Sequence, residues 1–138
     1  MKDLFHSLNP VTAIAPVSVA DNTPLVSAVI DRQGYDSASF VILTGALADA
    51  DASFAALLEE SDNGTAFTTV DAAALLGTAA LAGFTFADDN KTRKLGYAGS
   101  KRYLRLTVTP SSNGSAALIA AVALLGHPAV APAANPPA

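Results

Sequence analysis

The chemically versatile side chains are most concentrated between residues 91 and 110, in the stretch KTRKLGYAGSKRYLRLTVTP. This stretch holds six of the chain's eight basic residues: Lys91, Arg93, Lys94, Lys101, Arg102 and Arg105. Tyr97 and Tyr103 lie among them. Cationic side chains mixed with aromatic rings are typical of two kinds of surface. One binds nucleic acid by charge and stacking, and the other binds protein, because Arg and Tyr are enriched in protein interfaces.

Charge is distributed unevenly along the sequence. Residues 91–138 contain no acid, whereas residues 1–90 contain all twelve acids and two basic residues, and the net charge is −4. A basic patch on an acidic protein binds nucleic acid weakly, because long-range repulsion opposes phosphate neutralisation. The pattern favours separate acidic and basic lobes, with the basic lobe of one copy contacting an acidic surface of a neighbour. A merely solvated hairpin is an alternative.

Catalytic motifs are missing from the sequence. The two histidines, His6 and His127, belong to no recognisable arrangement with Ser, Asp or Glu, and the chain has neither a GxSxG motif nor a P-loop. The absence of cysteine excludes disulfides and thiolate metal sites. We therefore expect no enzymatic activity and no cofactor.

One segment partly matches a calcium-binding loop. The residues at its first, third, fifth and twelfth positions are Asp49, Asp51, Ser53 and Glu60. The sixth position is Phe54, where that loop requires glycine for its sharp turn. We therefore expect a polar turn that leads into a strand, and no metal site.

The segments that must position the candidate site residues are predicted to be strands. Clusters of Asn, Asp, Gly, Pro and Ser interrupt short apolar runs, which predicts an all-β single-domain antiparallel sandwich or barrel. Residues 12–20 contain Pro16, which is typical of an edge strand or a bulge. Residues 37–47 are apolar on both faces and predict a central strand. Residues 53–61 favour a strand by their setting between turns, although their composition also suits a helix.

Residues 91–125 predict a three-stranded meander. Within it, residues 102–109 alternate with period two, so that Leu104, Leu106 and Val108 face one way while Tyr103 and Arg105 face the other.

The turn before this strand contains Gly99, which is free to adopt positive φ. After it, residues 115–126 predict a buried returning strand. The resulting hairpin would gather the six basic residues on one lobe.

The segment between residues 70 and 90 contains patterns of both helix and extended structure. Residues 71–77 predict a helical turn capped by Asp71 and ended by Gly77. Phe84 and Phe86 then indicate an extended segment with both rings on one face.

The two ends of the chain predict extended arms. Residues 1–10 contain charged side chains where a signal peptide needs an apolar run, so no export signal is expected. Residues 127–138 hold five of the eight prolines and predict an extended tail. The apolar run 116–126 is shorter than the ~20 residues of a membrane-spanning helix, so no membrane partner is expected.

Four stretches carry a resemblance to a known family: DRQGYDS (31–37), FADDNKTRKLGY (86–97), KRYLRLTVTP (101–110) and LLGHP (124–128). Over residues 26–128 the chain resembles small tailed-bacteriophage virion proteins that are encoded near the major capsid protein. Proteins of this size and place resemble capsid cement or decoration proteins. Those are β-sandwiches of jelly-roll type that sit on the head surface and clamp neighbouring capsid subunits at two-fold or three-fold positions.

This resemblance implies a non-enzymatic virion protein on the capsid surface, whose partners are the major capsid protein and further copies of itself as a homodimer or homotrimer. We expect its contacts to come from the basic segment and the amino-terminal arm. These residues are Lys91, Arg93, Lys94, Tyr97, Lys101, Arg102, Tyr103 and Arg105, together with Leu4, Phe5 and Leu8. A head–tail connector or tail component is an alternative, and a nucleic-acid-binding accessory protein is a more remote one.

Overall fold

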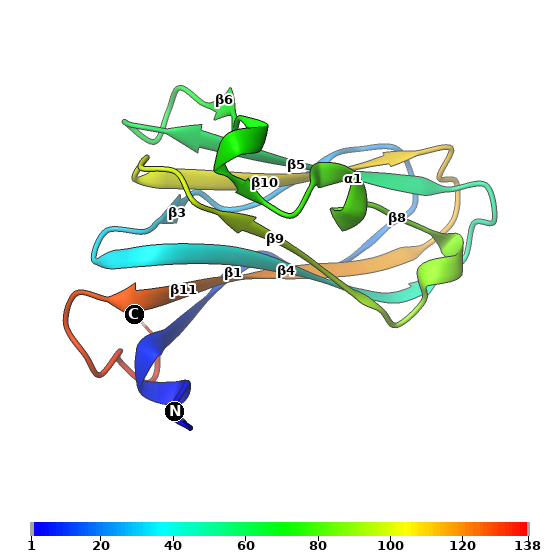
Figure 1. Ribbon diagram of the computed structural model, residues 1–138. Helices are drawn as coiled ribbons and strands as arrows, with labels where there is room; N and C mark the ends of the chain where they lie inside the picture. The colour runs from blue at the N-terminus through cyan, green and yellow to red at the C-terminus, as the bar shows by residue number, and fades with distance from the viewer. Residues whose placement is uncertain (1, 138) are drawn as a thin grey trace.

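The computed structural model describes residues 2–137 and folds them into two antiparallel β-sheets that pack face to face as a jelly-roll-like sandwich (Figure 1). The all-β sandwich prediction is therefore confirmed. Sheet A, the lower layer in Figure 1, has the order β1-β11-β4-β9-β7. Sheet B, the upper layer, has the order β2-β10-β5-β6, with β3 also pairing with β10 and β8 with β5.

The strands and helices are short except for five long strands. The strands are β1 (Leu8–Val19), β2 (Leu25–Val26), β3 (Ile30–Asp31), β4 (Tyr35–Leu47), β5 (Ser53–Ser61), β6 (Thr68–Thr69), β7 (Leu75–Leu76), β8 (Phe84–Thr85), β9 (Thr92–Tyr97), β10 (Tyr103–Ser111) and β11 (Ala117–Pro128). The helical turns are η1 (Phe5–Ser7), η2 (Ala72–Ala74), α1 (Ala79–Ala82) and η3 (Phe86–Asp88).

The core lies between the sheets and is built by period-two alternation. Leu104, Leu106 and Val108 of β10 point inward and are fully buried, as their spacing predicted. They lie in one apolar cluster with Phe40 and Ile42 of β4. Burial of these side chains drives the two sheets together.

The local strand predictions are confirmed. β1 is an edge strand of sheet A, and its register with β11 shifts between Thr12 and Ile14 and again between Ile14 and Val17, around Pro16. Because proline lacks an N–H donor, it fits at such an irregular edge. β4 lies in the middle of sheet A, and residues 53–61 form the strand β5.

The predicted meander over residues 91–125 is wrong. β9 pairs with β4 in sheet A, β10 pairs with β5 in sheet B, and β11 returns to sheet A. The connections on either side of β10 therefore cross between the layers. The first crossing is held by Arg32, whose Nε donates to Lys101 O at 2.5 Å and whose Nη2 donates to Gly99 O at 3.0 Å.

Gly99 does not adopt the predicted positive φ, because the glycines with positive φ are Gly34, Gly64 and Gly77. Its small size is required for another reason. A Cβ at Gly99 would lie 2.5 Å from Tyr97 Cζ, closer than real carbon contacts permit. The position therefore needs glycine for close approach to a ring.

The segment between β6 and β9 differs in detail from the prediction. η2 is a single turn in which Asp71 makes no side-chain cap, and Gly77 at φ +84° follows β7. Phe84 is buried, but Phe86 begins η3 and is exposed, so the two rings do not share an extended face.

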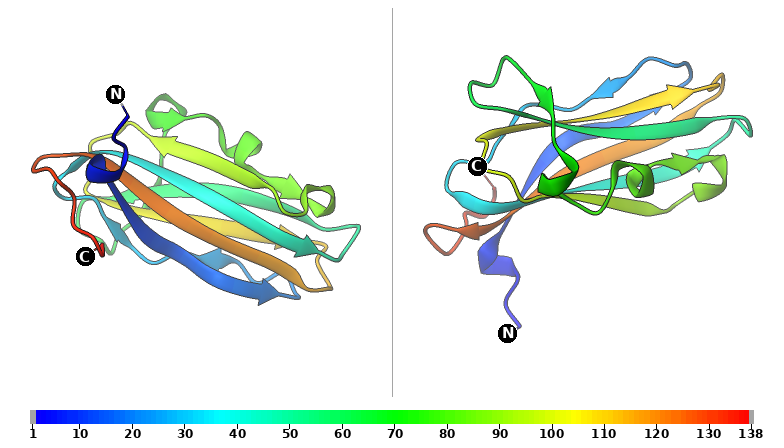
Figure 2. Two further views of the ribbon diagram at one scale, coloured as in Figure 1. Left: turned by 90° about the horizontal axis from the view of Figure 1, so that it is seen from below. Right: turned by 45° about the horizontal axis from the view of Figure 1, so that its top comes forward.

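Both ends of the chain lie at one end of the sandwich (Figure 2). β1 begins at Leu8, and the described residues before it, 2–7, include the helical turn η1. The proline-rich tail folds back on this segment, and Ala133 N donates to His6 O at 2.8 Å. Within residues 2–137 no helix is long and apolar enough to span a bilayer.

Candidate functional site

One end of the sandwich brings together segments that are far apart in the sequence. We call this end the tip, and it comprises residues 3–7, 31–35, 61–67, 98–103 and 127–134. Backbone hydrogen bonds connect four of these segments: Arg32 N to Arg102 O at 3.0 Å, Ala129 N to Gly34 O at 2.8 Å, and Ala133 N to His6 O at 2.8 Å. The fifth segment, 61–67, is joined to them through the ion pair of Asp62 and Lys101. The tip is the left end of the molecule in Figure 1.

Two of the basic residues of the tip, Lys101 and Arg102, are paired with acids, whereas Arg32 donates to backbone carbonyls. Lys101 Nζ lies 2.6 Å from Asp62 Oδ2, and Arg102 Nη2 lies 2.8 Å from Asp31 Oδ2. The hydrogen bond from Arg102 lowers the pKa of the Asp31 carboxyl below its usual value, and the bond to Asp62 raises the pKa of Lys101. Charge at the tip is therefore largely compensated.

The expected separation into acidic and basic lobes is wrong for the same reason. Arg105 Nη2 lies 2.9 Å from Glu59 Oε1, and Arg93 Nη2 lies 2.8 Å from Asp88 Oδ1. Sheet pairing places the basic residues of β9 and β10 beside acids from earlier in the chain, which a linear charge count does not anticipate.

The two tyrosines of the basic segment have different environments. Tyr97 is only 2% exposed, so it does not reach the surface, and burial raises the pKa of its hydroxyl above the usual value. Tyr103 is half-buried on the outer side of sheet B, and the Arg102 guanidinium lies 4.9 Å from the centre of its ring. Only Tyr103 can contribute to a contact surface.

The remaining basic residues lie away from the tip. Lys91 is exposed at the opposite end of sheet A, where its backbone N donates to Thr44 Oγ1. Lys94 is exposed on the outer side of β9 and Arg93 packs toward Gly83 O, to which its Nε donates at 3.2 Å. The six basic residues therefore do not form one patch.

Apolar side chains are exposed at the tip. Leu4 and Phe5 are 69% and 62% exposed, and Val130 in the tail is exposed too, whereas Leu8 is half-buried at the start of β1. His6 Nδ1 lies 2.6 Å from Asp3 Oδ2, and His127 Nδ1 lies 2.8 Å from Ser37 Oγ. The tip thus combines apolar side chains with compensated charges, a composition found in protein interfaces.

A second surface is the outward side of sheet A, which we call the A face. Figure 2 (left) looks onto it, with β1, β11 and β4 nearest the viewer. The strand register arranges its outward residues in five cross-strand rows: Leu8–Gly126–Ser37, Pro10–Leu124–Ser39–Gly96–Leu76, Thr12–Val122–Val41–Lys94, Ala120–Leu43–Thr92 and Ser18–Leu118. Lys94 is the one charged residue in these rows, so the A face is broad and nearly uncharged.

Leucines lie flat across glycines on the A face. A Cβ at Gly45 would lie 2.9 Å from Leu118 Cβ, and a Cβ at Gly96 would lie 2.8 Å from Leu76 Cβ. Only glycine leaves room for these side chains to lie along the sheet. Between them are shallow hollows, one of about 350 Å³ beside Leu43 and Leu118.

The outward side of sheet B is different, because it carries charges of both signs. The ion pair of Arg105 and Glu59 joins its two middle strands near the tip, and the Arg105 guanidinium stacks 4.1 Å from the centre of the Phe67 ring.

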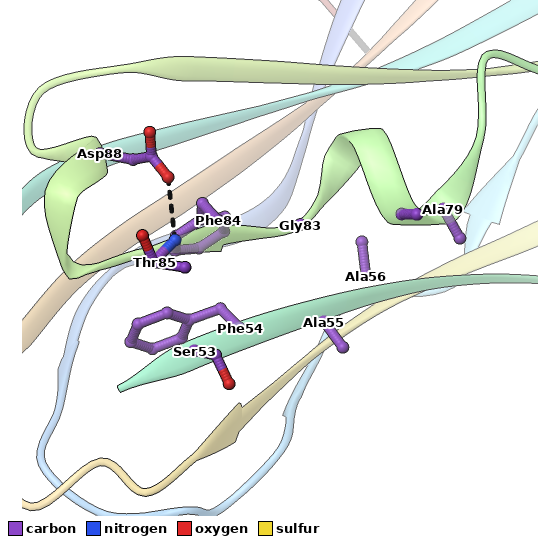
Figure 3. Close-up of a pocket in the computed structure, with 10 residues that line it drawn as sticks. Ser53, Phe54, Ala55, Ala56, Ala79, Gly83, Phe84, Thr85 and Asp88 are labelled. Atoms are coloured by element: carbon purple, nitrogen blue, oxygen red, sulfur yellow. Dashed lines mark hydrogen bonds between the residues drawn. The ribbon is translucent and has the colours of Figure 1, made fainter. Parts of the chain in front are cut away.

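A groove of about 520 Å³ is lined by residues of β5, α1 and β8 and by Asp88 of η3 (Figure 3). Phe54 and Phe84 stack at one end with ring centres 4.7 Å apart. Asp88 is the one ionisable residue that lines it, and its carboxylate accepts a 2.9 Å hydrogen bond from Thr85 N and pairs with Arg93. The lining of the groove therefore contains no two ionisable residues that could act together as general acid and general base.

The calcium-loop residues do not converge. The Asp49 carboxylate accepts hydrogen bonds from Gly114 N at 2.7 Å and Asp51 N at 2.9 Å, so it orders two adjacent turns. Ser53 and Glu60 lie at opposite ends of β5. Within residues 2–137, no group of three or more His, Asp or Glu is arranged to hold a metal ion.

Comparison with known proteins identifies the fold. No protein-family model and no curated protein matches the sequence. The structure is similar to the PBSX exported protein XepA, with a TM-score of 0.55 and 17% identity over 85% of this chain and 36% of that chain. It is also similar to the Clostridium thermocellum endo-1,4-beta-D-xylanase 10B, solved as CBM22-1-GH10 modules with xylohexaose, with a TM-score of 0.51 and 13% identity over 95% of this chain and 28% of that chain. The chain thus spans about a third of the length of either structure, and the likeness at these identities is one of fold.

The A face was not predicted as a site from the sequence. The sequence does contain a pattern that points to this face, because residues 37–47 and 115–126 are apolar on both faces. That pattern predicts burial within the chain, whereas the structure covers only one side of these strands.

Proposed function

We propose that this chain is a non-enzymatic structural protein of a tailed-phage virion, which binds the outer surface of the assembled head as a cement or decoration protein and holds neighbouring major capsid subunits together. The observation that carries the proposal is the tip, where exposed Leu4 and Phe5 lie at the same end of the sandwich as Lys101, Arg102 and Tyr103. Exposed apolar groups next to Arg and Tyr suit a protein contact.

Two further points support the proposal. The sequence resemblance to small phage virion proteins covers most of the chain, and the fold is similar to that of the phage-related protein XepA. The compensated ion pairs of the tip suit a protein partner better than nucleic acid, because Asp31 and Asp62 already neutralise two of the cations that phosphates would need.

Such a protein acts by binding the assembled shell and not its separate subunits. Binding then shifts the equilibrium between separate subunits and intact head towards the head, and the shift grows with the fraction of sites that are occupied. The symmetric shell repeats the same binding site many times. Where copies are linked to one another, a modest affinity at each site therefore gives a high overall avidity. We assign the tip to the capsid contact.

The test is the amount and position of this chain on purified phage particles, measured by quantitative mass spectrometry and electron cryomicroscopy. A head-coating protein is expected in hundreds of copies over the shell, with binding to assembled heads and none to dissociated capsid subunits. A ring of about a dozen copies at the portal would instead identify a connector or tail component. Absence from particles would refute the proposal.

A further inference from the structure

We infer that the A face is the contact through which two copies of this chain associate, sheet against sheet, as a symmetric dimer. The first observation is the composition of its central strands. β11 carries apolar side chains on both faces, and β4 does so from Phe40 to Leu43, which is typical of strands that are covered on both sides. Sheet B covers only the inner side, so Leu43 remains 53% exposed and Leu118 45% exposed.

The charge distribution allows a second copy to cover this face. Each copy has a net charge of −4, so two copies repel one another over most of their surfaces. The rows of the A face contain no acid, and their single cation, Lys94, lies toward the β9 edge of the sheet. Two copies can therefore approach through this face without burying an unpaired carboxylate.

The surface has the shape that sheet packing requires. Leu76 and Leu118 lie along the sheet over Gly96 and Gly45, which leaves a flat face with low ridges. A hollow of about 460 Å³ lies between Leu76 and Leu124, and another of about 350 Å³ lies beside Leu118. A two-fold contact needs ridges and hollows on one surface, because each copy presents the same patch to the other.

The area is also sufficient. β1 and β11 have 12 residues each and β4 has 13. At about 3.3 Å per residue and about 4.8 Å between strands, these three strands and β9 present roughly 650 Å² in projection. A standard protein interface buries about 800 Å² of accessible surface per partner, and accessible area exceeds projected area. Two such sheets would pack about 10 Å apart.

This inference does not depend on head binding. The amino-terminal segment of the tip adjoins the A face, because Asp3 and Leu4 line the same hollow as Leu76. A dimer through the A face leaves Tyr103 and the preceding connection of each tip uncovered, because β10 belongs to sheet B. If the proposed function holds as well, one dimer carries two capsid contacts, which strengthens attachment through avidity.

The test is the mass of the full chain by light scattering across the micromolar range, for the wild type and two matched variants. Leu43→Lys places a charge on the A face, whereas Leu57→Lys places the same charge on the outward side of sheet B, where Leu57 is 37% exposed. We expect dimers for the wild type and Leu57→Lys. Leu43→Lys should weaken dimerisation at least about 30-fold, because each copy would bury an unpaired charge in a central position.

Leu43→Ser serves as a milder variant if Leu43→Lys fails to fold by circular dichroism, and it too should shift the equilibrium toward monomer. A monomeric wild type throughout this range, or equal dimerisation of the two lysine variants, would overturn the inference. A monomeric wild type whose Leu43→Lys variant no longer binds heads would assign the A face to the capsid instead. Dimers that dissociate on Leu43→Lys, in a chain absent from particles, would refute head binding and leave this inference standing.

Discussion

The Tyr97 hydroxyl donates a hydrogen bond to Glu60 Oε1 across 3.0 Å, and this bond joins sheet A to sheet B. Tyr97 ends β9, and Glu60 lies near the end of β5. The same hydroxyl oxygen accepts a hydrogen bond from Lys101 N at 2.9 Å, so it also fixes the connection that crosses between the sheets. The pKa of a tyrosine hydroxyl is ordinarily about 10 and burial raises that of Tyr97 further, so the group is protonated and acts as a donor at neutral pH.

Tyr97→Phe should lower the free energy of unfolding by about 1–2 kcal/mol, because it removes this hydrogen bond and leaves the part-buried Glu60 without its donor. Tyr103→Phe is the matched control, since the Tyr103 hydroxyl has no hydrogen-bond partner within residues 2–137 and its loss should change stability by less than about 0.5 kcal/mol. Urea unfolding followed by circular dichroism measures both. Equal stabilities of the two variants would show that the Tyr97 bond does not join the sheets in solution.

Gly99→Ala should destabilise the fold by about 1–3 kcal/mol, because the new methyl group would overlap the Tyr97 ring in a closely packed site. Gly114→Ala provides the comparison. Its Cβ would meet Asp49 Oδ2 at an ordinary 3.5 Å, and its φ is not positive. Thermal unfolding should therefore place Gly114→Ala near the wild type and Gly99→Ala well below it, and the reverse order would contradict the packing argument.

Local patterns predicted the strands well, because each depends on residues close in sequence. Pro16 marked the irregular edge strand, and the alternation of Leu104, Leu106 and Val108 gave the inward face of β10. Residues 53–61 became a strand despite their helix-favouring composition, because pairing with β10 along its whole length outweighs a weak intrinsic propensity.

The assignment of strands to sheets was not predictable in the same way. Adjacent strands most often pair, so β9 and β10 were expected to form a hairpin. Their separation depends on Arg32, which is far from them in sequence and binds the backbone of the crossing connection. The ion pairs of Lys101, Arg102 and Arg105 are equally long-range, and the basic segment therefore looked more isolated in the sequence than it is in the fold.

Acid should destabilise this protein partly through Asp49. Its hydrogen bonds from Gly114 N and Asp51 N lower its pKa in the folded state below the usual 3.8. The folded state then binds fewer protons than the unfolded state, so the stabilisation is complete above about pH 4 and is lost as pH falls from 3.8 through the lower folded-state pKa.

Asp49→Asn should therefore flatten the fall in melting temperature as pH drops below about 4. Asp36→Asn is the control, because the exposed Asp36 carboxylate has no hydrogen-bond partner in the described part of the chain. Differential scanning calorimetry across this pH range compares the two. An unchanged slope in Asp49→Asn would show that its carboxylate is not bonded in this way.

Phe5→Ser should weaken attachment to phage heads about tenfold or more, because it removes an exposed ring from the tip, and aromatic side chains dominate the energy of protein contacts. Phe86→Ser is the matched control, since Phe86 is also exposed but lies in η3, at the other end of the sandwich (Figure 1). Both changes lie outside the buried core, so circular dichroism should report unchanged folds. Heads lacking the chain are incubated with each variant, and occupancy is measured against concentration. Equal affinities of the two variants would contradict the assignment of the tip to the capsid, whereas a specific loss in Phe5→Ser would place the contact beside the amino-terminal segment.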